Sequence, residues 1–242
     1  MQIKCVELNE NNILFDNCNI KNRNTNIIYP KYKYNNNVYD NLVMETNWFP
    51  FFGYITDCQW VNANSIKTKI RFINNNFSQD ILQSFNKLDK KFENFFPNSM
   101  PKAQINRFKR PNSYEPIIKK WGFSSDDMDS DTDDMDSDTD DKNIGKNIGK
   151  NIDETVFGLS IGLDNLHVTT PIFVHEIDNN NNLFIKRLYN LKLNDFRELL
   201  IHGKSKIKML IQLDKLWYNT TCRSNDNFGA CLIIKQIEIN NL

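Results

Sequence analysis

Apolar side chains occupy every second position near the end of the segment KSKIKMLIQL, residues 204–213, and this alternation constrains the fold more than any other feature of the chain. The alternating residues are Ile207, Met209, Ile211 and Leu213. Side chains two residues apart lie on the same face of an extended strand, so the pattern predicts a strand with one buried face. The segment GACLIIKQIEI, residues 229–239, is predicted to be a second, well-buried strand. Both strands need partners that cover their apolar faces, which favours a β-rich fold.

Shorter strands are predicted in both halves of the chain. NIIYPKYKY, residues 26–34, and VYDNLVMET, residues 38–46, are joined by three asparagines, and this turn signal predicts a hairpin. Further strands are expected at residues 49–55, 67–73, 154–163 and 170–177. In the segment 67–73, three basic residues alternate with Thr68, Ile70 and Phe72, so one edge or face of this strand is expected to be basic. The basic residues are Lys67, Lys69 and Arg71.

One long helix is predicted over residues 78–96, with Ser78 as its N-cap and Asp80 in its first turn. Its apolar positions recur at helical spacing at Ile81, Leu82, Phe85, Leu88 and Phe92. A short helix is predicted at NDFRELLIHG, where Asp195 and Glu198 suggest a capping box and Gly203 a C-terminal glycine. Many short strands with one long helix predict a mainly β protein with some α, built as an antiparallel barrel or sandwich.

A low-complexity segment interrupts this pattern at residues 124–152. It begins with SSDDMDSDTDDMDSDTDD, in which a seven-residue unit is repeated in tandem, and continues with KNIGKNIGKNI. Such composition cannot form a packed core, so we predict a disordered acidic insertion. Residues 1–123 and 153–242 are then the first and second parts of one domain.

Outside the acidic tract the chain is strongly basic, and we call these other residues the basic body. The whole chain has 30 basic and 30 acidic residues, and ten of the aspartates lie between positions 126 and 141. Without those ten, 20 acidic residues face 30 basic ones, so the other 226 residues carry a net charge of +10. Such a body is expected to attract polyanions.

Three interpretations of the acidic tract remain open. A calcium loop of the EF-hand type needs glycine at its sixth position and glutamate at its twelfth, where this tract has Thr132 and Asp138. A solvated run of charge is the second interpretation. In the third, the tethered polyanion competes with phosphate groups for the protein's own basic surface.

Residues 101–123 combine six basic residues with interleaved aromatic residues and one acid, Glu115. Single-stranded nucleic acids bind such surfaces through backbone phosphates and stacked bases. The alternative is that the aromatic residues lie in the core and the basic ones only solvate a loop. The segment YPKYKY, residues 29–34, has the same two interpretations. The aromatic residues of 47–54 are expected to be mostly core, and an exposed subset would stack on bases or contact a protein.

Enzyme and metal signals are absent from the sequence. There is no phosphate-binding loop, no GxSxG and no HExxH motif, and we expect neither catalysis nor a cofactor. The five cysteines include no CxxC pair, and the three histidines are not spaced with them for zinc. Widely spaced cysteines indicate reduced thiols and an intracellular location. No apolar stretch approaches the ~18 residues of a membrane span.

The closing segment, residues 202–239, resembles the phage gene 2.5-type single-stranded DNA-binding proteins, whose relatives occur in nucleocytoplasmic large DNA viruses. The shared pattern is a Gly-x-x-Lys-hydrophobic-Lys strand, a tryptophan, a glycine and a last strand ending near Gln-Ile. The matching residues are Gly203, Lys206, Ile207, Lys208, Trp217, Gly229, Gln236 and Ile237. Residues 27–55 and the stretch YEPIIK, residues 114–119, also look like segments of the viral members. In the phage proteins the acidic run is a C-terminal tail, whereas here it is internal.

The resemblance implies an OB-like barrel that binds single-stranded DNA without strong sequence preference, in viral replication and recombination. It also implies replication proteins as partners, a homodimer, and a location at replication sites in the host cytoplasm or nucleus, or in the virion. The runner-up function is a viral structural or transcription-associated protein that binds duplex DNA or protein partners. The predicted interface, with Trp217 as a groove wall rather than a free stacking residue, is Lys31, Tyr32, Lys33, Arg107, Lys109, Arg110, Tyr114, Lys119, Lys120, Trp121, Lys206, Lys208 and Trp217.

Overall fold

The computed structural model describes eight stretches of the chain: residues 1–15, 27–56, 59–62, 65–73, 79–95, 113–121, 154–218 and 227–242. The predicted acidic insertion and the basic residues Arg107, Lys109 and Arg110 lie outside these stretches. The division of the domain at residues 124–152 therefore stays a prediction.

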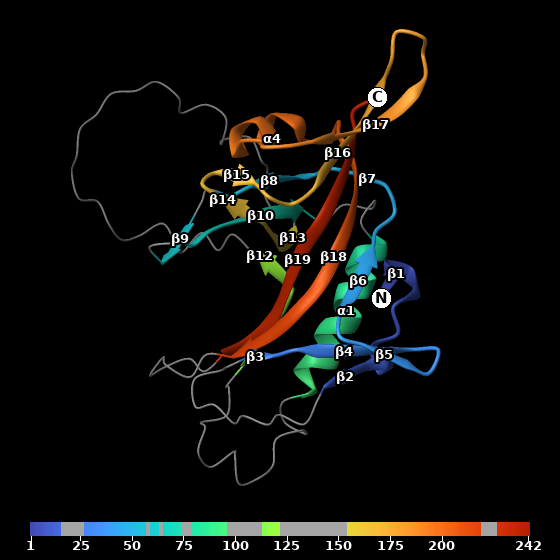
Figure 1. Ribbon diagram of the computed structural model, residues 1–242. Helices are drawn as coiled ribbons and strands as arrows, with labels where there is room; N and C mark the ends of the chain where they lie inside the picture. The colour runs from blue at the N-terminus through green and yellow to red at the C-terminus, as the bar shows by residue number, and fades with distance from the viewer. Residues whose placement is uncertain are drawn as a thin grey trace, which may run out of the picture.

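Two long antiparallel strands form the centre of the molecule. β18 (Lys206–Tyr218) and β19 (Asn227–Asn240) pair from Lys206 with Asn240 to Tyr218 with Phe228. Figure 1 shows them as a curved ribbon pair that runs the length of the molecule. The predicted alternation is confirmed, because Ile207, Met209, Ile211 and Leu213 are all buried.

The main sheet follows the order β1-β6-β18-β19-β13-β10-β8. Its other strands on this path are β1 (Gln2–Lys4), β6 (Leu42–Glu45), β13 (Glu154–Ile161), β10 (Ser65–Ile73) and β8 (Gly53–Ile55). Within the described stretches, twelve strand ladders are antiparallel, and four are parallel. The predicted mainly β class with one main helix is confirmed, although the sheet mixes both strand directions.

A short segment bridges the middle of this sheet. β13 and β19 pair at one position in the described residues, Ser160 with Ile233. Beside this point, β11 (Ser113–Glu115) pairs with β19 and β12 (Ile118–Trp121) pairs with β13. Residues 113–121, which we call the bridging segment, therefore connect the two halves of the sheet.

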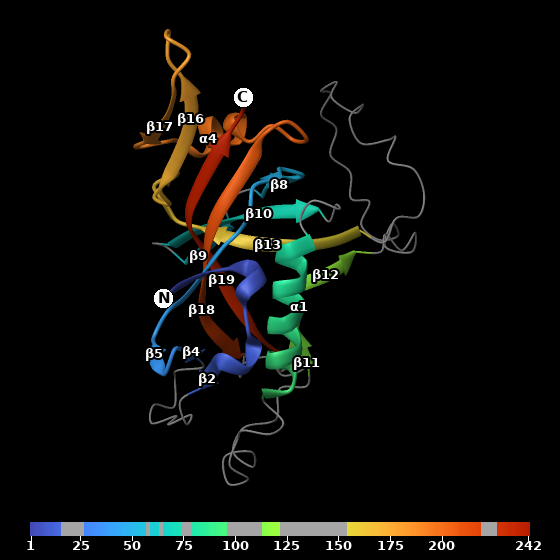
Figure 2. The ribbon, with the colours of Figure 1, turned by 90° about the vertical axis from the view of Figure 1, so that its right-hand side faces the viewer.

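The helix α1 (Gln79–Glu93) lies where the sequence predicts it. Its inner face buries Ile81, Phe85, Leu88 and Phe92, and Phe85 packs edge-on against Phe157 of β13. Figure 2 shows α1 beside the bridging segment and one end of β13. The helix therefore covers the side of the sheet on which β11 and β12 meet.

The N-terminal hairpin is shorter than predicted. β4 (Pro30–Tyr34) and β5 (Asn37–Tyr39) pair around Asn35 and Asn36, whose φ angles of 47° and 65° suit a two-residue hairpin turn. β4 also pairs with β2 (Ile13–Phe15), which gives a separate three-stranded sheet. Residues 42–45 leave this hairpin and pair with β18 instead.

The predicted caps of the second helix are wrong. α4 (Leu193–Leu199) begins after Lys192, which makes no side-chain capping hydrogen bond, and Asp195 is already its third residue. Gly203 lies four residues beyond the helix end, in the turn before β18, where its φ is 73°. Its N–H donates to the Phe51 carbonyl at 2.7 Å, so the glycine serves this turn rather than the helix.

A hairpin of β16 (Ile172–Ile177) and β17 (Leu183–Leu188) extends from one end of the molecule (Figures 1 and 2). β17 was not predicted from the sequence, although the asparagines of 179–182 marked its turn. The remaining elements are β3 (Ile27–Ile28), β7 (Phe49–Pro50), β9 (Gln59–Asn62), β14 (Leu163–Asp164), β15 (His167–Val168) and the 3-10 helices Cys5–Glu7 and Glu10–Asn12. In the described residues, no helix is long and apolar enough to span a membrane.

Candidate nucleic-acid interface

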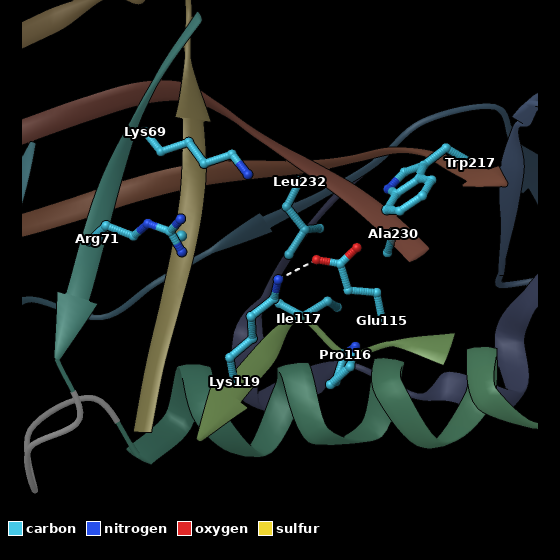
Figure 3. A pocket seen from close by; sticks show the side chains of 10 residues that line it. Lys69, Arg71, Glu115, Pro116, Ile117, Lys119, Trp217, Ala230 and Leu232 are labelled. Atoms are coloured by element: carbon cyan, nitrogen blue, oxygen red, sulfur yellow. Dashed lines mark hydrogen bonds and ion pairs between the residues drawn. The ribbon is translucent and has the colours of Figure 1, made fainter. Parts of the chain in front are cut away.

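A shallow hollow opens on the sheet beside the bridging segment (Figure 3). Its volume of about 90 Å³ is far below the ~300–1,000 Å³ of pockets that enclose a small molecule. The hollow is therefore too small to enclose a small molecule. We call it the basic hollow, and its lining residues are Lys69, Arg71, Glu115, Pro116, Ile117, Lys119, Gly158, Trp217, Ala230 and Leu232.

Strand β10 supplies two of its three cations. Ile70 and Phe72 point into the core, and the alternation of the strand puts Lys69 and Arg71 on the opposite face. The sequence prediction of a basic face is thus confirmed for these two residues, while the side chain of Lys67 lies outside the described part. Tyr54 of β8 pairs with Arg71 and is 50% exposed, which extends the same face by an aromatic ring.

A glycine makes room for Arg71. Gly158 of β13 is the direct partner of Arg71 across the ladder. A Cβ atom at position 158 would lie 3.1 Å from both Cδ and Nη1 of Arg71. The arginine side chain therefore lies across the β13 backbone, where a larger residue would crowd it.

The third cation, Lys119, comes from β12 and forms an ion pair with Glu115 (Figure 3). Glu115 is the one acidic residue in the lining of the hollow. The pKa of Lys69 is lowered, first by partial burial and then by the positive charges of Arg71 and Lys119. The positive charges of Arg71 and Lys119 thus disfavour the protonated form of Lys69, and a bound anion would offset this effect.

Trp217 of β18 forms the aromatic wall of the hollow. It pairs with Gly229 of β19, and a Cβ atom there would lie 2.9 Å from Cζ2 of the indole. The indole therefore lies against bare backbone, with Ala230 and Leu232 as an apolar floor beside it. Trp217 therefore lines the hollow, and its role as the groove wall of a DNA interface stays a prediction.

The structure gives Tyr114 a packing role. Its ring contacts Phe228 at a centroid distance of 5.1 Å, and its hydroxyl donates to Oδ1 of Asp89 at 2.6 Å. Burial, followed by the charge of Asp89, raises the pKa of Tyr114. Lys120 and Trp121 belong to β12, but their side chains lie outside the described part of the structure.

Tyr32 is a correction to the predicted interface. Its side chain is 1% exposed, and its hydroxyl accepts a hydrogen bond from the Asn9 N–H at 3.3 Å. A ring buried in this way has no free face for a base, so Tyr32 is a core residue. The outward residues of the same strand are Lys31, whose Nζ lies 3.7 Å from Oδ1 of Asp40, and the exposed Lys33.

The two predicted lysines of β18 do not line the hollow. Lys206 is exposed at the start of the strand. Lys208 forms an ion pair with Glu45 of β6. The hydrogen bond between them raises the pKa of Lys208 and lowers the pKa of Glu45. The hollow thus contains Lys119 and Trp217 of the predicted set, together with Lys69 and Arg71, which the prediction omitted although their alternation signalled a basic face.

Among the described residues, no group of three or more histidine, cysteine, aspartate or glutamate side chains could hold a metal ion. The chain matches no protein-family model and no curated protein. Among solved structures it is similar to the single-stranded DNA-binding protein from bacteriophage Enc34 in complex with ssDNA, with 10% identity. The match covers 91% of this chain and 92% of that chain, at a TM-score of 0.37.

Proposed function

We propose that this protein binds single-stranded DNA without strong sequence preference, and that the basic hollow is part of its binding surface. The observation that carries the proposal is that three cations and an indole face the same hollow. Lys69, Arg71 and Lys119 would contact phosphate groups, and Trp217 would contact a base or sugar. This pairing of backbone cations with an aromatic wall is how proteins hold single strands.

A preference for single-stranded over duplex DNA follows from which base faces Trp217 can contact. In a duplex the base faces are stacked against one another, so an aromatic side chain contacts them only where the strands separate. In a single strand each base offers a face, and stacking is worth roughly 1–3 kcal/mol per base. Stacking and phosphate contacts do not read base edges, so sequence should matter little.

The biological role we propose is coverage of single strands during viral DNA replication and recombination, with replication proteins as partners. The support is the resemblance of the C-terminal pattern, residues 203–237, to the phage and viral single-stranded DNA-binding proteins, together with the basic body. Lys31, Lys33, Lys206 and the basic residues of 101–123 remain candidates for a longer path of the strand.

A second candidate is a structural or transcription-associated protein that binds duplex DNA or other proteins. It is favoured by the β16–β17 hairpin, whose Leu183, Phe184 and Ile185 are exposed although they are apolar. Exposed apolar clusters of this kind often mark protein contacts. This candidate predicts no preference for single strands over duplex DNA.

Titration of intrinsic fluorescence with oligo-dT and with a duplex of equal length separates the two candidates. We expect the single strand to bind more tightly, with log affinity falling linearly with log salt by about 0.7 for each phosphate contact. Replacement of Lys69, Arg71 and Lys119 by glutamine should together reduce the slope by about 2. Equal affinity for both DNAs, or no binding to either, would refute the proposed function.

A further inference from the structure

The bridging segment changes strand partner in the middle of its course. Tyr114 and Glu115 pair with Phe228 and Gly229 of β19, and three residues later Ile118 pairs with Phe157 of β13. Pro116 and Ile117 belong to neither ladder. The backbone at this change of partner therefore needs hydrogen-bond acceptors from elsewhere in the fold.

A carboxylate of α1 provides them. Oδ1 of Asp89 accepts from the Tyr114 hydroxyl at 2.6 Å and from the Ile117 N–H at 2.9 Å. Its Oδ2 accepts from the Ile118 N–H at 3.3 Å. One side chain thus joins the end of β11, the change of partner and the start of β12.

The same segment forms one wall of the basic hollow. Glu115, Pro116, Ile117 and Lys119 all line it, and Figure 3 shows α1 running beneath Pro116 and Lys119. Ile118 packs against the core, so alternation along β12 turns Lys119 to the hollow. The direction of the Lys119 side chain therefore depends on how the backbone of 117 and 118 is held.

We propose that Asp89 is a positioning residue of the nucleic-acid interface, which holds the bridging segment so that Lys119 faces the phosphate backbone. The inference rests on the proposed function for its DNA-binding part. Asp89 itself touches no lining cation; it acts through the backbone of residues 117 and 118. Burial, partly offset by these three donors, raises the pKa of Asp89, as expected of a carboxylate kept inside the fold by its hydrogen bonds.

The substitution Asp89→Asn keeps the size and shape of the side chain but removes one of its two hydrogen-bond acceptors. An amide has one oxygen acceptor, and its NH₂ group would face at least one N–H or O–H donor. Glu93→Gln is the matched control, because it removes one negative charge one turn later on the same helix, at an exposed position. Any effect of net charge on DNA binding should be the same in both variants.

In oligo-dT titrations we expect D89N to lose about 0.7 of the salt slope, as for one lost phosphate contact, while E93Q keeps the wild-type slope. Lys119→Gln should lose the same amount, and the D89N/K119Q double variant should lose no more than either single variant. Additive losses, or a wild-type slope in D89N, would overturn the inference.

Hydrogen exchange tests, without DNA, whether Asp89 holds the backbone of the bridging segment. In D89N, the amides of Ile117 and Ile118 should exchange about ten- to a hundredfold faster, while the amides of β18 keep their rates. Unchanged rates at these two amides would refute the positioning role of Asp89 even if the wild-type protein binds DNA. If the wild-type protein binds no DNA, the exchange rates still show whether Asp89 holds the backbone of residues 117 and 118, and only the proposed function fails. Should D89N fail to fold, Tyr114→Phe removes a single hydrogen bond and should produce a smaller change of the same sign.

Discussion

At the scale of single residues, two glycines in the strands that flank β10, Gly158 of β13 and Gly53 of β8, meet different parts of Arg71. Gly158 leaves room for the end of the Arg71 side chain, whereas a Cβ atom at Gly53 would lie 2.0 Å from the Arg71 backbone oxygen. A flexible side chain can move away from a new methyl group, but a strand backbone cannot. The two positions therefore separate an effect on binding from an effect on stability.

We expect Gly158→Ala to change the free energy of unfolding by about 0.5 kcal/mol or less, and to weaken oligo-dT binding because Arg71 is displaced. Gly53→Ala should instead destabilise the fold by about 1–3 kcal/mol. Urea unfolding and DNA titration of both variants measure the two effects. R71Q supplies the reference, since G158A should add little to its loss of affinity. If G158A alone binds as the wild type does, the position of Arg71 is not important for binding.

The lowered pKa of Lys69 gives a pH dependence with a definite sign. Phosphate binds the protonated amine, so affinity should fall as the pH rises through this lowered pKa, before ordinary lysines titrate. In K69R the charge persists to high pH, and the early part of the fall should disappear. Titrations between about pH 7 and 10 test this. An identical pH profile in K69R would place Lys69 away from the phosphates.

At the scale of elements, the sequence predicts which segments form strands and helices better than it predicts which strands pair with one another. The alternation of β10 and β18 and the helical spacing of α1 follow from local side chains, and the structure confirms them. Tyr32 and Tyr34 share a face of β4 and differ in exposure, since the 3-10 helix at 10–12 and β2 cover one end of the strand. Such coverage is set by residues distant in the sequence.

The bridging segment shows the same limit. Its residue pattern supports a core role and a binding role equally, and the structure divides these roles between Tyr114, which packs, and Lys119, which lines the hollow. The change of strand partner at Pro116 decides this division, because it sets which side chains turn inward. No local pattern encodes the partner strands, so the hollow itself could not be predicted.

Helix α1 contacts the core through Leu88 and the bridging segment through Asp89. Substitutions of these two neighbouring residues should therefore have different effects, one on stability and the other on DNA binding. Leu88 is fully buried, so Leu88→Ala should cost about 2–5 kcal/mol of unfolding free energy. Leu82 is partly buried on the same helix, and L82A should cost less. Folded L88A keeps the Asp89 carboxylate, and its salt slope in DNA titrations should equal that of wild type. A reduced slope would mean that helix packing, rather than Asp89, sets the position of Lys119.

At the scale of the whole molecule, charge is divided between a basic body of +10 and ten aspartates within residues 126–141. Carboxylates tethered to the chain compete with phosphates for the same cations, and the competition weakens as salt shortens the range of the field, to about 10 Å at 0.1 M. The internal position of the tract, a few residues after the bridging segment, keeps its local concentration high. We therefore propose that the tract lowers affinity for DNA at low salt.

Replacement of residues 126–141 by a neutral glycine–serine segment of equal length removes the charge and keeps the spacing. We expect oligo-dT to bind this variant more tightly, by a factor that shrinks toward one between about 0.05 and 0.5 M salt. A second variant with serine for the non-aspartate residues keeps all ten charges and should bind as the wild type does, which separates charge from sequence. A neutral variant with wild-type affinity at low salt would show that the tract is solvated charge without a part in binding.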